Sequence, residues 1–226
     1  MNDIKYLEDI NKFHLYYVES IGSTNTFLKE NFSKYPNNSI LLAKVQTNGR
    51  GRYTRIWKSD EDYTFSILFK DLHHNEIIAP MSIVRALKEY GFDTKIKWPN
   101  DIYLNNKKLS GILIESVYGG ISHLATIVGI GINKTDKEEV LGIGLNKNID
   151  SIDLISKIIH EYNILIKDDF NNYINEYISY SNVINKKIIY QNEEYIVKGI
   201  NEFGHLIIEN DNISKTISSD EIIIKY

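Results

Sequence analysis

Three of the four arginines in this 226-residue chain lie within six positions, in the stretch Gln46-Thr47-Asn48-Gly49-Arg50-Gly51-Arg52-Tyr53-Thr54-Arg55-Ile56-Trp57. Lysine is the usual cation elsewhere in the chain. Arginine offers a planar fork that binds a carboxylate or phosphate through two hydrogen bonds, which lysine cannot do. Glycines on both sides of Arg50 let the backbone approach a ligand and move. The stretch therefore predicts an anion-binding loop, with a solvated basic loop or an Arg/Gly nucleic-acid segment as alternatives.

A second unusual stretch is Lys97-Trp98-Pro99-Asn100-Asp101, which contains one of only two tryptophans. Pro99 fixes its own φ and keeps the preceding residue extended, so the segment predicts a stiff corner. Asn100 can both donate to and accept from the edge of a heteroaromatic base. Asp101 can hold Mg²⁺ directly or through water. Turn formation alone explains Pro-Asn-Asp, but it does not explain the neighbouring lysine and tryptophan.

The third stretch is Lys107-Lys108-Leu109-Ser110-Gly111-Ile112-Leu113-Ile114-Glu115. Two cations at a predicted hairpin lead into an apolar strand that contains Gly111. Glycine inside a strand often marks the close approach of a ligand or of another backbone segment. Taken alone, a lysine that protects an edge strand from aggregation is the more common explanation.

The composition excludes several classes of protein. The absence of cysteine rules out disulfides, cysteine-ligated zinc, iron–sulfur clusters and a thiol nucleophile, and the six histidines show no metal-ligand spacing. The net charge of −4 argues against a broad surface that tracks nucleic-acid phosphates. Neither a P-loop nor a Rossmann fingerprint is present. No apolar run approaches the roughly 18 residues of a membrane span, and the N-terminus lacks a secretory signal, so we expect a cytoplasmic protein without membrane contact.

Hydrophobic periodicity predicts a mixture of strands and helices. Strands are expected over 13–19, 39–45, 63–69, 94–98, 102–104, 109–118 and 121–132, and helices from Ser23 and over 80–90, 152–166 and 170–180. Residues 47–58 are expected to form a loop. From 186 to 226 short apolar and polar runs alternate between turn signals, which is typical of a small all-β barrel. We therefore predict a boundary near residue 182, with one domain over 1–182 and a second over 183–226.

Together, and in this order, the three stretches resemble the biotin protein ligase family, whose patterns are G-R-G-R-x-x-R-x-W, K-W-P-N-D and K-L-x-G-I-L-x-E. Ser23-Thr24-Asn25 and Gly129-Ile-Gly-Ile-Asn133 match the family's S-T-N and G-x-G-I-N. The resemblance covers roughly residues 14–135. It implies an α+β fold, with a mixed β-sheet and flanking helices like those of class II synthetases, followed by an SH3-like β-barrel. The implied reaction activates biotin with ATP as biotinyl-AMP, and then transfers biotin to a lysine of a biotin carboxyl carrier protein or domain.

The resemblance also implies roles for individual residues. Those at the reacting centre are Arg50, Arg52, Lys97, Asp101 and Lys108. The biotin-binding set is Ser23, Thr24, Asn25, Gln46, Gly49, Arg50, Gly51, Arg52, Lys108 and Gly111. The ATP-binding set is Arg52, Arg55, Trp57, Lys97, Asn100, Asp101 and Asn133. Asp101 would help to place Mg²⁺, which arrives with ATP, or would accept a proton from the attacking lysine. Biotin and MgATP are substrates, and no tightly bound prosthetic group is implied.

Several features add to this picture or depart from it. Residues 48–56 are expected to be mobile without ligands and ordered with biotin and ATP, because a closed loop would protect the reactive adenylate from water. Many relatives have glycine where this chain has Thr54. The segment Gly142-Ile-Gly-Leu-Asn146 repeats the G-x-G-I-N pattern, and we favour Asn133 over Asn146 as the family's asparagine, because it directly follows the predicted strand.

Three functions remain open: a biotin protein ligase, a lipoate ligase or octanoyltransferase of related fold, and a binding module that uses the arginine loop without chemistry. Some family members carry an N-terminal DNA-binding domain, but only 22 residues precede Ser23. That is too few for a winged helix-turn-helix, so we expect the monofunctional type and no sequence-specific DNA binding. A homodimer is compatible with the sequence but is not decided by it.

Overall fold

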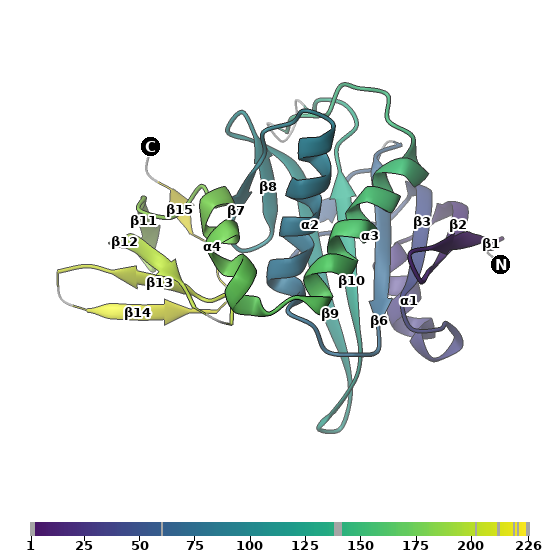
Figure 1. The fold of residues 1–226 in the computed structure, drawn as a ribbon, viewed down its shortest axis with the longest axis horizontal. Helices are drawn as coiled ribbons and strands as arrows, with labels where there is room; N and C mark the ends of the chain where they lie inside the picture. Colours follow the sequence, from purple (N-terminus) through teal and green to yellow (C-terminus); the bar gives the residue numbers. More distant parts are fainter. Residues whose placement is uncertain are drawn as a thin grey trace.

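A large mixed β-sheet forms the centre of the molecule in the computed structural model, which describes residues 3–59, 61–137, 142–201, 203–211, 213–218, 220 and 222–224. Its strands lie in the order β1-β2-β3-β6-β10-β9-β8-β7 (Figure 1). β2 and β3 run parallel, and the other neighbours pair antiparallel. The bounds are β1 Lys5–Ile10, β2 Phe13–Ile21, β3 Ser39–Gln46, β6 Tyr63–Phe69, β7 Lys95–Lys97, β8 Asp101–Leu104, β9 Lys107–Gly119 and β10 Ser122–Ile132. The predicted mixed sheet is confirmed.

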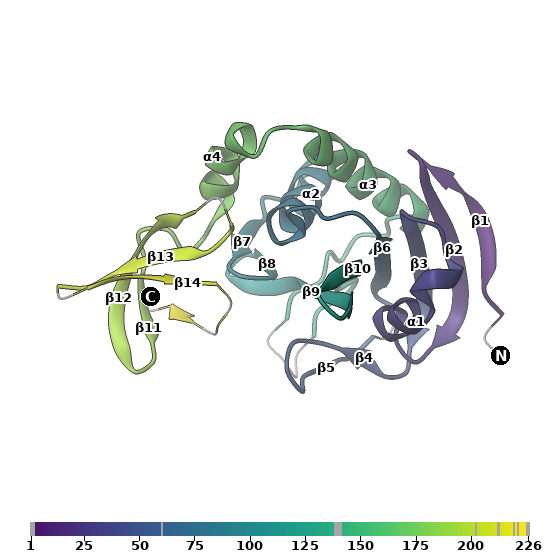
Figure 2. The same ribbon diagram turned by 90° about the horizontal axis from the view of Figure 1, so that it is seen from below.

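Helices cover both faces of this sheet, as Figure 2 shows. α2 (Asn75–Glu89) and α3 (Ser151–Lys167) lie on one face, and α4 (Phe170–Tyr180) continues from α3 towards the C-terminal strands. α1 (Thr24–Asn31) lies on the other face, beside the short strands β4 (Gly49–Arg50) and β5 (Ile56–Trp57), and is followed by the 3₁₀ turn Phe32–Lys34.

The amphipathic pattern of α3 explains why it packs where it does. Its buried residues recur three or four positions apart, which places them on one stripe of the helix: they are Leu154, Ile155, Ile158, Ile159, Tyr162 and Leu165. The Asp150 side chain accepts hydrogen bonds from the backbone N–H groups of Ile152 and Asp153 and so caps the helix. This stripe belongs to the larger of two apolar clusters, and the smaller one includes Leu28 of α1.

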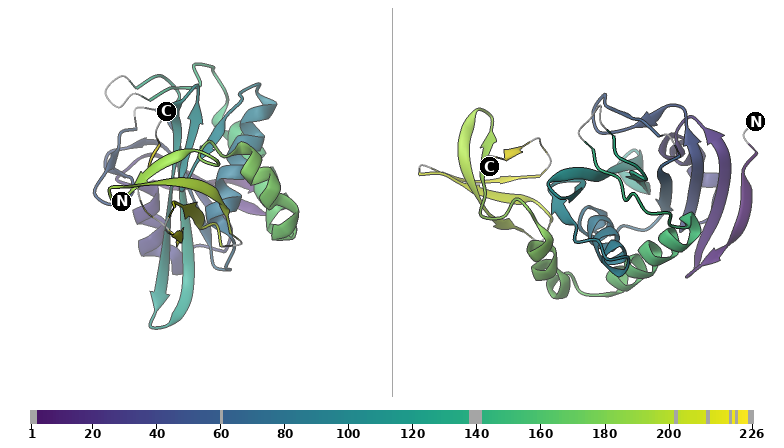
Figure 3. Two further views of the ribbon diagram at one scale, coloured as in Figure 1. Left: turned by 90° about the vertical axis from the view of Figure 1, so that its left-hand side faces the viewer. Right: turned by 90° about the horizontal axis from the view of Figure 1, so that it is seen from above.

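The C-terminal strands form a separate small sheet, seen at one side of the molecule in Figure 3. It contains β11 (Lys187–Tyr190), β12 (Glu193–Ile200), β13 (Leu206–Glu209), β14 (Ser214–Ile217) and β15 (Ile223–Ile224), in the order β14-β13-β12-β11-β15. The predicted C-terminal β-unit is confirmed, but the sheet is not closed into a barrel over the described residues. β15 contributes only two residues, which pair with β11 and leave β14 as the opposite edge. Tyr226, the last residue of the predicted barrel, lies outside the described part.

The C-terminal sheet is joined to the large sheet near the predicted boundary. The backbone N–H of Asn182 donates to the carbonyl of Ile96 at 2.9 Å. The buried indole Nε1 of Trp98 donates to the carbonyl of Gly204, also at 2.9 Å. Trp98 precedes Pro99 through a cis peptide bond. A boundary at residue 182 stays a prediction.

Two elements differ from the sequence-based expectation. α2 begins at Asn75 and not at Pro80, which lies inside the helix. Burial of Ile77, Ile78 and Ala79 in the first turns outweighs the hydrogen bond that proline cannot make. β1 was not predicted, because five of its six residues are exposed and carry no apolar alternation. Within the described ranges, no helix combines the length and apolarity needed to cross a membrane.

Candidate active site

A cavity of about 690 Å³ is lined by residues of the large sheet, the N-terminus of α1 and the β4–β5 segment. The residues predicted for the site come together here from five separate stretches of the chain. Those that line the cavity are Ser23, Thr24, Asn25, Gln46, Arg50, Gly51, Arg52, Arg55, Trp57, Asn100, Asp101, Lys108, Gly111 and Asn133. Gly49 and Lys97 are the two predicted residues that do not line it. The sequence motifs, although far apart in the chain, therefore meet around one cavity.

One end of the cavity is built from uncharged side chains, which we call the neutral floor: Thr24, Asn25, Gln46 and Ser66. The Gln46 Oε1 atom accepts from the Thr24 backbone N–H at 2.8 Å and lies 3.0 Å from the Thr24 hydroxyl. The Thr24 and Ser66 hydroxyl oxygens are 2.6 Å apart, and Ser66 donates to Asn25 Oδ1 at 2.6 Å. Because Ser66 uses its single proton on Asn25, the Thr24 proton is shared between Ser66 and Gln46 Oε1. Gln46 Oε1 and Thr24 Oγ1 then retain lone pairs for a donor group of a ligand.

The neutral floor is made possible by a glycine in the neighbouring strand. A Cβ atom at Gly129 of β10 would lie 2.2 Å from Asn25 Oδ1, so a larger residue there would displace the asparagine. Ser23 precedes α1 and accepts a hydrogen bond from the Thr26 N–H through its side chain, which leaves its own proton available. Ser66 was not identified from the sequence, since a serine within an apolar strand carries no distinctive signal.

Trp57 lies on a flat part of the sheet formed by two paired glycines. Gly111 of β9 and Gly131 of β10 are direct partners in the strand register. A Cβ atom at Gly131 would lie 2.4 Å from the indole of Trp57, and one at Gly111 would lie 3.0 Å from it. The indole Nε1 of Trp57 is buried without a hydrogen-bond partner among the described residues. The sequence predicted the close approach of a ligand or of another backbone segment at Gly111, and the structure shows the tryptophan ring there.

The opposite end of the cavity, which we call the charged end, contains Arg52, Asp101 and Lys108. The Lys108 ammonium lies 2.7 Å from Asp101 Oδ1. Arg52 donates to Asn100 Oδ1 at 3.3 Å, and Asn100 in turn donates to the carbonyl of Ile112 at 2.8 Å. The K-W-P-N-D corner thus places its amide and carboxylate against the two cations from the other motifs.

Arg50 is held by Glu115, the last residue of the third motif. Arg50 Nη1 lies 3.2 Å from both carboxylate oxygens, and the Lys29 ammonium is 2.9 Å from Oε1. Burial raises the pKa of Glu115, but hydrogen bonds from Lys29 and Asn25 and the charge of Arg50 outweigh it and leave the pKa below its usual value. Glu115 was not predicted as a functional residue, although its place at the end of the K-L-x-G-I-L-x-E pattern was a usable signal.

The two predicted residues outside the cavity have other surroundings. Lys97 donates to the Tyr103 hydroxyl at 3.1 Å, and its ammonium lies over the Tyr103 ring. Gly49 is buried in β4, where a Cβ atom would lie 2.4 Å from the carbonyl oxygen of Trp57. Gly49 therefore allows β4 and β5 to pair. These two short strands also show that the segment 47–58 is not wholly irregular.

The two repeated G-x-G-x-N segments have different positions. Asn133 lines the cavity, and its amide donates to the carbonyls of Lys108 and Ile143. Asn146 does not line the cavity, and its amide donates to Asp136 Oδ1 at 2.9 Å. The backbone N–H of Gly144 and this amide hold the pKa of the Asp136 carboxyl below its usual value. The geometry favours Asn133 as the ligand-facing asparagine.

No group of three or more His, Cys, Asp or Glu side chains in the described segments is arranged to hold a metal ion. Asp101 and Asp136 are carboxylates that line the cavity. A single carboxylate with water and phosphate ligands suits Mg²⁺ that arrives bound to a nucleotide, rather than a resident metal.

Comparisons with known proteins agree with this geometry. The chain is 33% identical over 133 residues to biotin--protein ligase 2 of Arabidopsis thaliana, a match that covers 53% of this chain but 40% of the plant protein. It is 27% identical to the bifunctional ligase/repressor BirA of Escherichia coli, covering 91% of this chain and 72% of that protein. A solved structure of biotin protein ligase from Aquifex aeolicus in complex with biotin and ATP superposes with a TM-score of 0.75 at 27% identity, covering 93% of this chain and 98% of that one.

The matches differ in how much of each relative the chain spans: less than half of the plant protein, but nearly the whole of the Aquifex chain. The family model described as the biotin/lipoate A/B protein ligase family matches residues 17–133, which include every motif that lines the cavity. Since that match covers more than half of the 226 residues, the chain belongs to the biotin/lipoate A/B protein ligase family.

Proposed function

We propose that the chain is a biotin protein ligase, which activates biotin with ATP and transfers it to a lysine of a biotin carboxyl carrier protein. The observation that carries the proposal is the cavity itself, because it joins a neutral floor rich in hydrogen-bond acceptors to a charged end. Biotin has the matching polarity, with an uncharged ureido ring at one end and a carboxylate at the other. The relatives named above support the same activity.

The neutral floor favours a ureido ring over other small acyl groups. Gln46 Oε1 and Thr24 Oγ1 offer lone pairs to the ring N–H groups, and the Ser23 hydroxyl has a proton for the ring carbonyl. A lipoate dithiolane or the end of an octanoyl chain has no N–H to donate. Buried acceptors would then lose their partners, and this is the situation in which a site rejects an analogue most strongly. Biotin is therefore the preferred substrate within the family.

The charged end suits the first chemical step. A carboxylate oxygen of biotin bonds to the α-phosphorus of ATP, the bond from that phosphorus to the bridging oxygen breaks, and pyrophosphate leaves. Two anions must meet, so fixed cations lower the barrier. Arg52 and Lys108 line the cavity there, and Arg50, which also lines the cavity, supplies a third positive charge. No protein nucleophile is required, because positioning and electrostatics supply the catalysis.

The other motif residues fit the nucleotide side of the same cavity. Arg55, Trp57, Asn100 and Asn133 line it, and the Trp57 indole N–H has no protein partner among the described residues. Lys97 does not line the cavity, and its ammonium donates to the Tyr103 hydroxyl. Mg²⁺ enters as part of MgATP, with Asp101 as the nearest carboxylate from the K-W-P-N-D corner.

In the second step the lysine amine of the carrier attacks the acyl carbon of biotinyl-AMP, and AMP leaves. The amine must lose a proton, since a free lysine has a pKa of about 10.4. Asp101, which already lies 2.7 Å from the Lys108 ammonium, is the proton acceptor that we favour. An Asp101→Asn protein should therefore form biotinyl-AMP but transfer it slowly. Transfer of preformed biotinyl-AMP at the wild-type rate would exclude this role.

Pyrophosphate release tests the proposal as a whole. We expect release only when biotin and ATP are both present, and no release when lipoate or octanoate replaces biotin. Addition of an apo carrier domain should then yield a biotinylated lysine, measured by intact mass. Release with lipoate in place of biotin would assign the chain to the other branch of the family, and no release with any acid would favour a binding module. The specific carrier, a homodimer, the absence of DNA binding and a cytoplasmic location stay predictions.

A further inference from the structure

The neutral floor is connected to the arginine loop by an unbroken series of hydrogen bonds that ends at Glu115. Ser66 donates to Asn25 Oδ1 at 2.6 Å, and the other end of the same amide, Asn25 Nδ2, donates to Glu115 Oε2 at 3.1 Å. Arg50 Nη1 then donates to both oxygens of Glu115. The same carboxylate thus fixes an asparagine of the floor and an arginine of the loop.

Glu115 is well placed to orient Arg50 without touching a ligand itself. Its side chain is 12% exposed, whereas that of Arg50 is 40% exposed. Arg50 lines the cavity and Glu115 does not. A half-exposed guanidinium that is bound by a nearly buried carboxylate has one favoured position, since each of the two hydrogen bonds is charge-assisted.

The arginine loop is attached to the body of the molecule at its beginning, through Arg52 and Trp57, and through Arg50. β4 and β5 pair with each other and belong to no larger sheet. The backbone N–H groups of Thr47 and Asn48 donate to the carbonyls of Ile21 and Gly22, which fixes the beginning of the loop. Beyond Gly49 the Arg50 side chain reaches Glu115 on β9 and Thr26 on α1, and so connects the loop to the body of the molecule.

We propose that Glu115 is a positioning residue, which holds Arg50 and the β4–β5 segment over the cavity and couples them to the neutral floor. The functional part of this inference rests on the proposed ligase activity. The structural part, the attachment of the loop by the Arg50–Glu115 pair, does not.

A double-mutant cycle tests the functional part, with Glu115→Gln, Arg50→Gln and the double variant. Glutamine keeps an acceptor for Asn25 but removes the charge that binds Arg50. We expect Glu115→Gln to raise KM for biotin about tenfold, as expected for loss of a charge-assisted pair, with KM for ATP unchanged. In the Arg50→Gln background the second substitution should add no more than about a twofold change. A full tenfold effect in that background would overturn the proposal.

Lys29→Gln is the matched control, because it removes the other cation bound to the same carboxylate. Lys29 lies on α1, does not line the cavity and is as exposed as Arg50, at 42%. We expect its KM for biotin to stay at the wild-type value. An increase equal to that of Glu115→Gln would mean that Glu115 acts only by balancing charge, and would contradict a role through Arg50.

Amide hydrogen exchange of residues 49–57 tests the structural part in the ligand-free protein, whatever its activity. Exchange should become faster in Glu115→Gln and in Arg50→Gln, no faster still in the double variant, and unchanged in Lys29→Gln. Wild-type exchange in Glu115→Gln would overturn the proposal even in an active enzyme. Faster exchange in a protein that releases no pyrophosphate would reject the proposed function and keep the attachment.

Discussion

The two ends of the cavity are built in opposite ways. In the neutral floor, Thr24, Asn25 and Ser66 are buried and joined by short hydrogen bonds between uncharged groups. At the charged end, Asp101 and Lys108 form an ion pair that is partly open to solvent. A buried network of neutral groups is rigid and costly to leave unsatisfied, so it selects a ligand by shape and donor pattern. Partly solvated charges can exchange partners, which a reaction that brings in phosphate requires.

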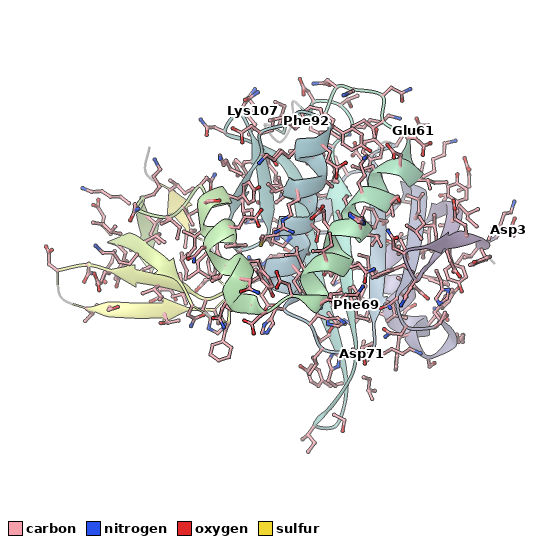
Figure 4. All side chains as sticks on the ribbon, in the orientation of Figure 1. Asp3, Glu61, Phe69, Asp71, Phe92 and Lys107 are labelled. Atoms are coloured by element: carbon pink, nitrogen blue, oxygen red, sulfur yellow. The ribbon has the colours of Figure 1, made fainter. Side chains whose placement is uncertain are left out.

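The largest effect should come from the charged end. Replacing Lys108 with glutamine removes a cation that faces the developing negative charge, so kcat for pyrophosphate release should fall by about 10²–10³, with a smaller change in KM for biotin. Lys107→Gln is the control, because this neighbouring lysine points away from the molecule at the β8–β9 turn (Figure 4). An equal loss in both variants would mean that the overall charge matters and not the position.

A substitution in the neutral floor should change KM for biotin and not kcat. Thr24→Val keeps the shape but removes a hydroxyl that shares its proton between Ser66 and Gln46 and retains lone pairs for the ligand. We expect KM for biotin to rise about a hundredfold with kcat nearly unchanged, since buried polar partners are left unsatisfied in the complex. Steady-state rates at saturating ATP measure this. A fall in kcat at unchanged KM would mean that the neutral floor contributes to catalysis as the charged end does, and would contradict the comparison.

A smaller effect is expected when the support of the neutral floor is changed. Gly129→Ala places a Cβ atom 2.2 Å from Asn25 Oδ1, so either the strand or the asparagine must move. We expect the free energy of unfolding to fall by about 2 kcal/mol, as for other overpacked sites. Gly22→Ala is the control, because nothing lies within 4 Å of its added Cβ. Urea unfolding measures the free energy of unfolding of both variants. Equal values would mean that the space beside Gly129 is not needed for Asn25.

The smallest effect concerns pH. The native pKa of Glu115 lies below its usual value, so the folded protein binds fewer protons at this site than the unfolded chain. Its contribution to stability is therefore present above the unfolded value of about 4.3 and is lost as the pH falls through the native pKa. The stability difference between wild type and Glu115→Gln should shrink below pH 4.3, as followed by urea unfolding. A constant difference across this pH range would mean that folding does not lower the pKa of Glu115.

The sequence predicted the elements whose signals are local. The hairpin predicted before Lys107 turns at Asn105 and Asn106, which both have positive φ, and α3 extends only one residue beyond the predicted range at each end. The start of α2 was wrong, because the burial of Ile77 and Ile78 is a tertiary effect that overrides the signal of Pro80.

The cavity was predicted in its members but not in its internal contacts. Motif matching identified Arg50 and Asn25, which line it. It could not identify Ser66 or the connection through Glu115, because these depend on residues about 40 to 90 positions apart that meet only in the folded sheet. Lys97 has a motif position like that of Asp101, yet its ammonium lies on Tyr103 and not in the cavity. Strand register places Lys97 beside Asp101, but only the Asp101 side chain lines the cavity.

The hydrogen bond from the Trp98 indole to the Gly204 carbonyl connects the C-terminal sheet to the segment that carries Asp101. Trp98 is buried, and the chain needs only three more residues to reach Asp101. A displacement of the small sheet, for instance by a bound protein, would therefore move the indole of Trp98. It would also shift the Asp101 carboxylate that lies against Lys108. Removing the last forty or so residues would leave the buried Trp98 indole N–H without this acceptor.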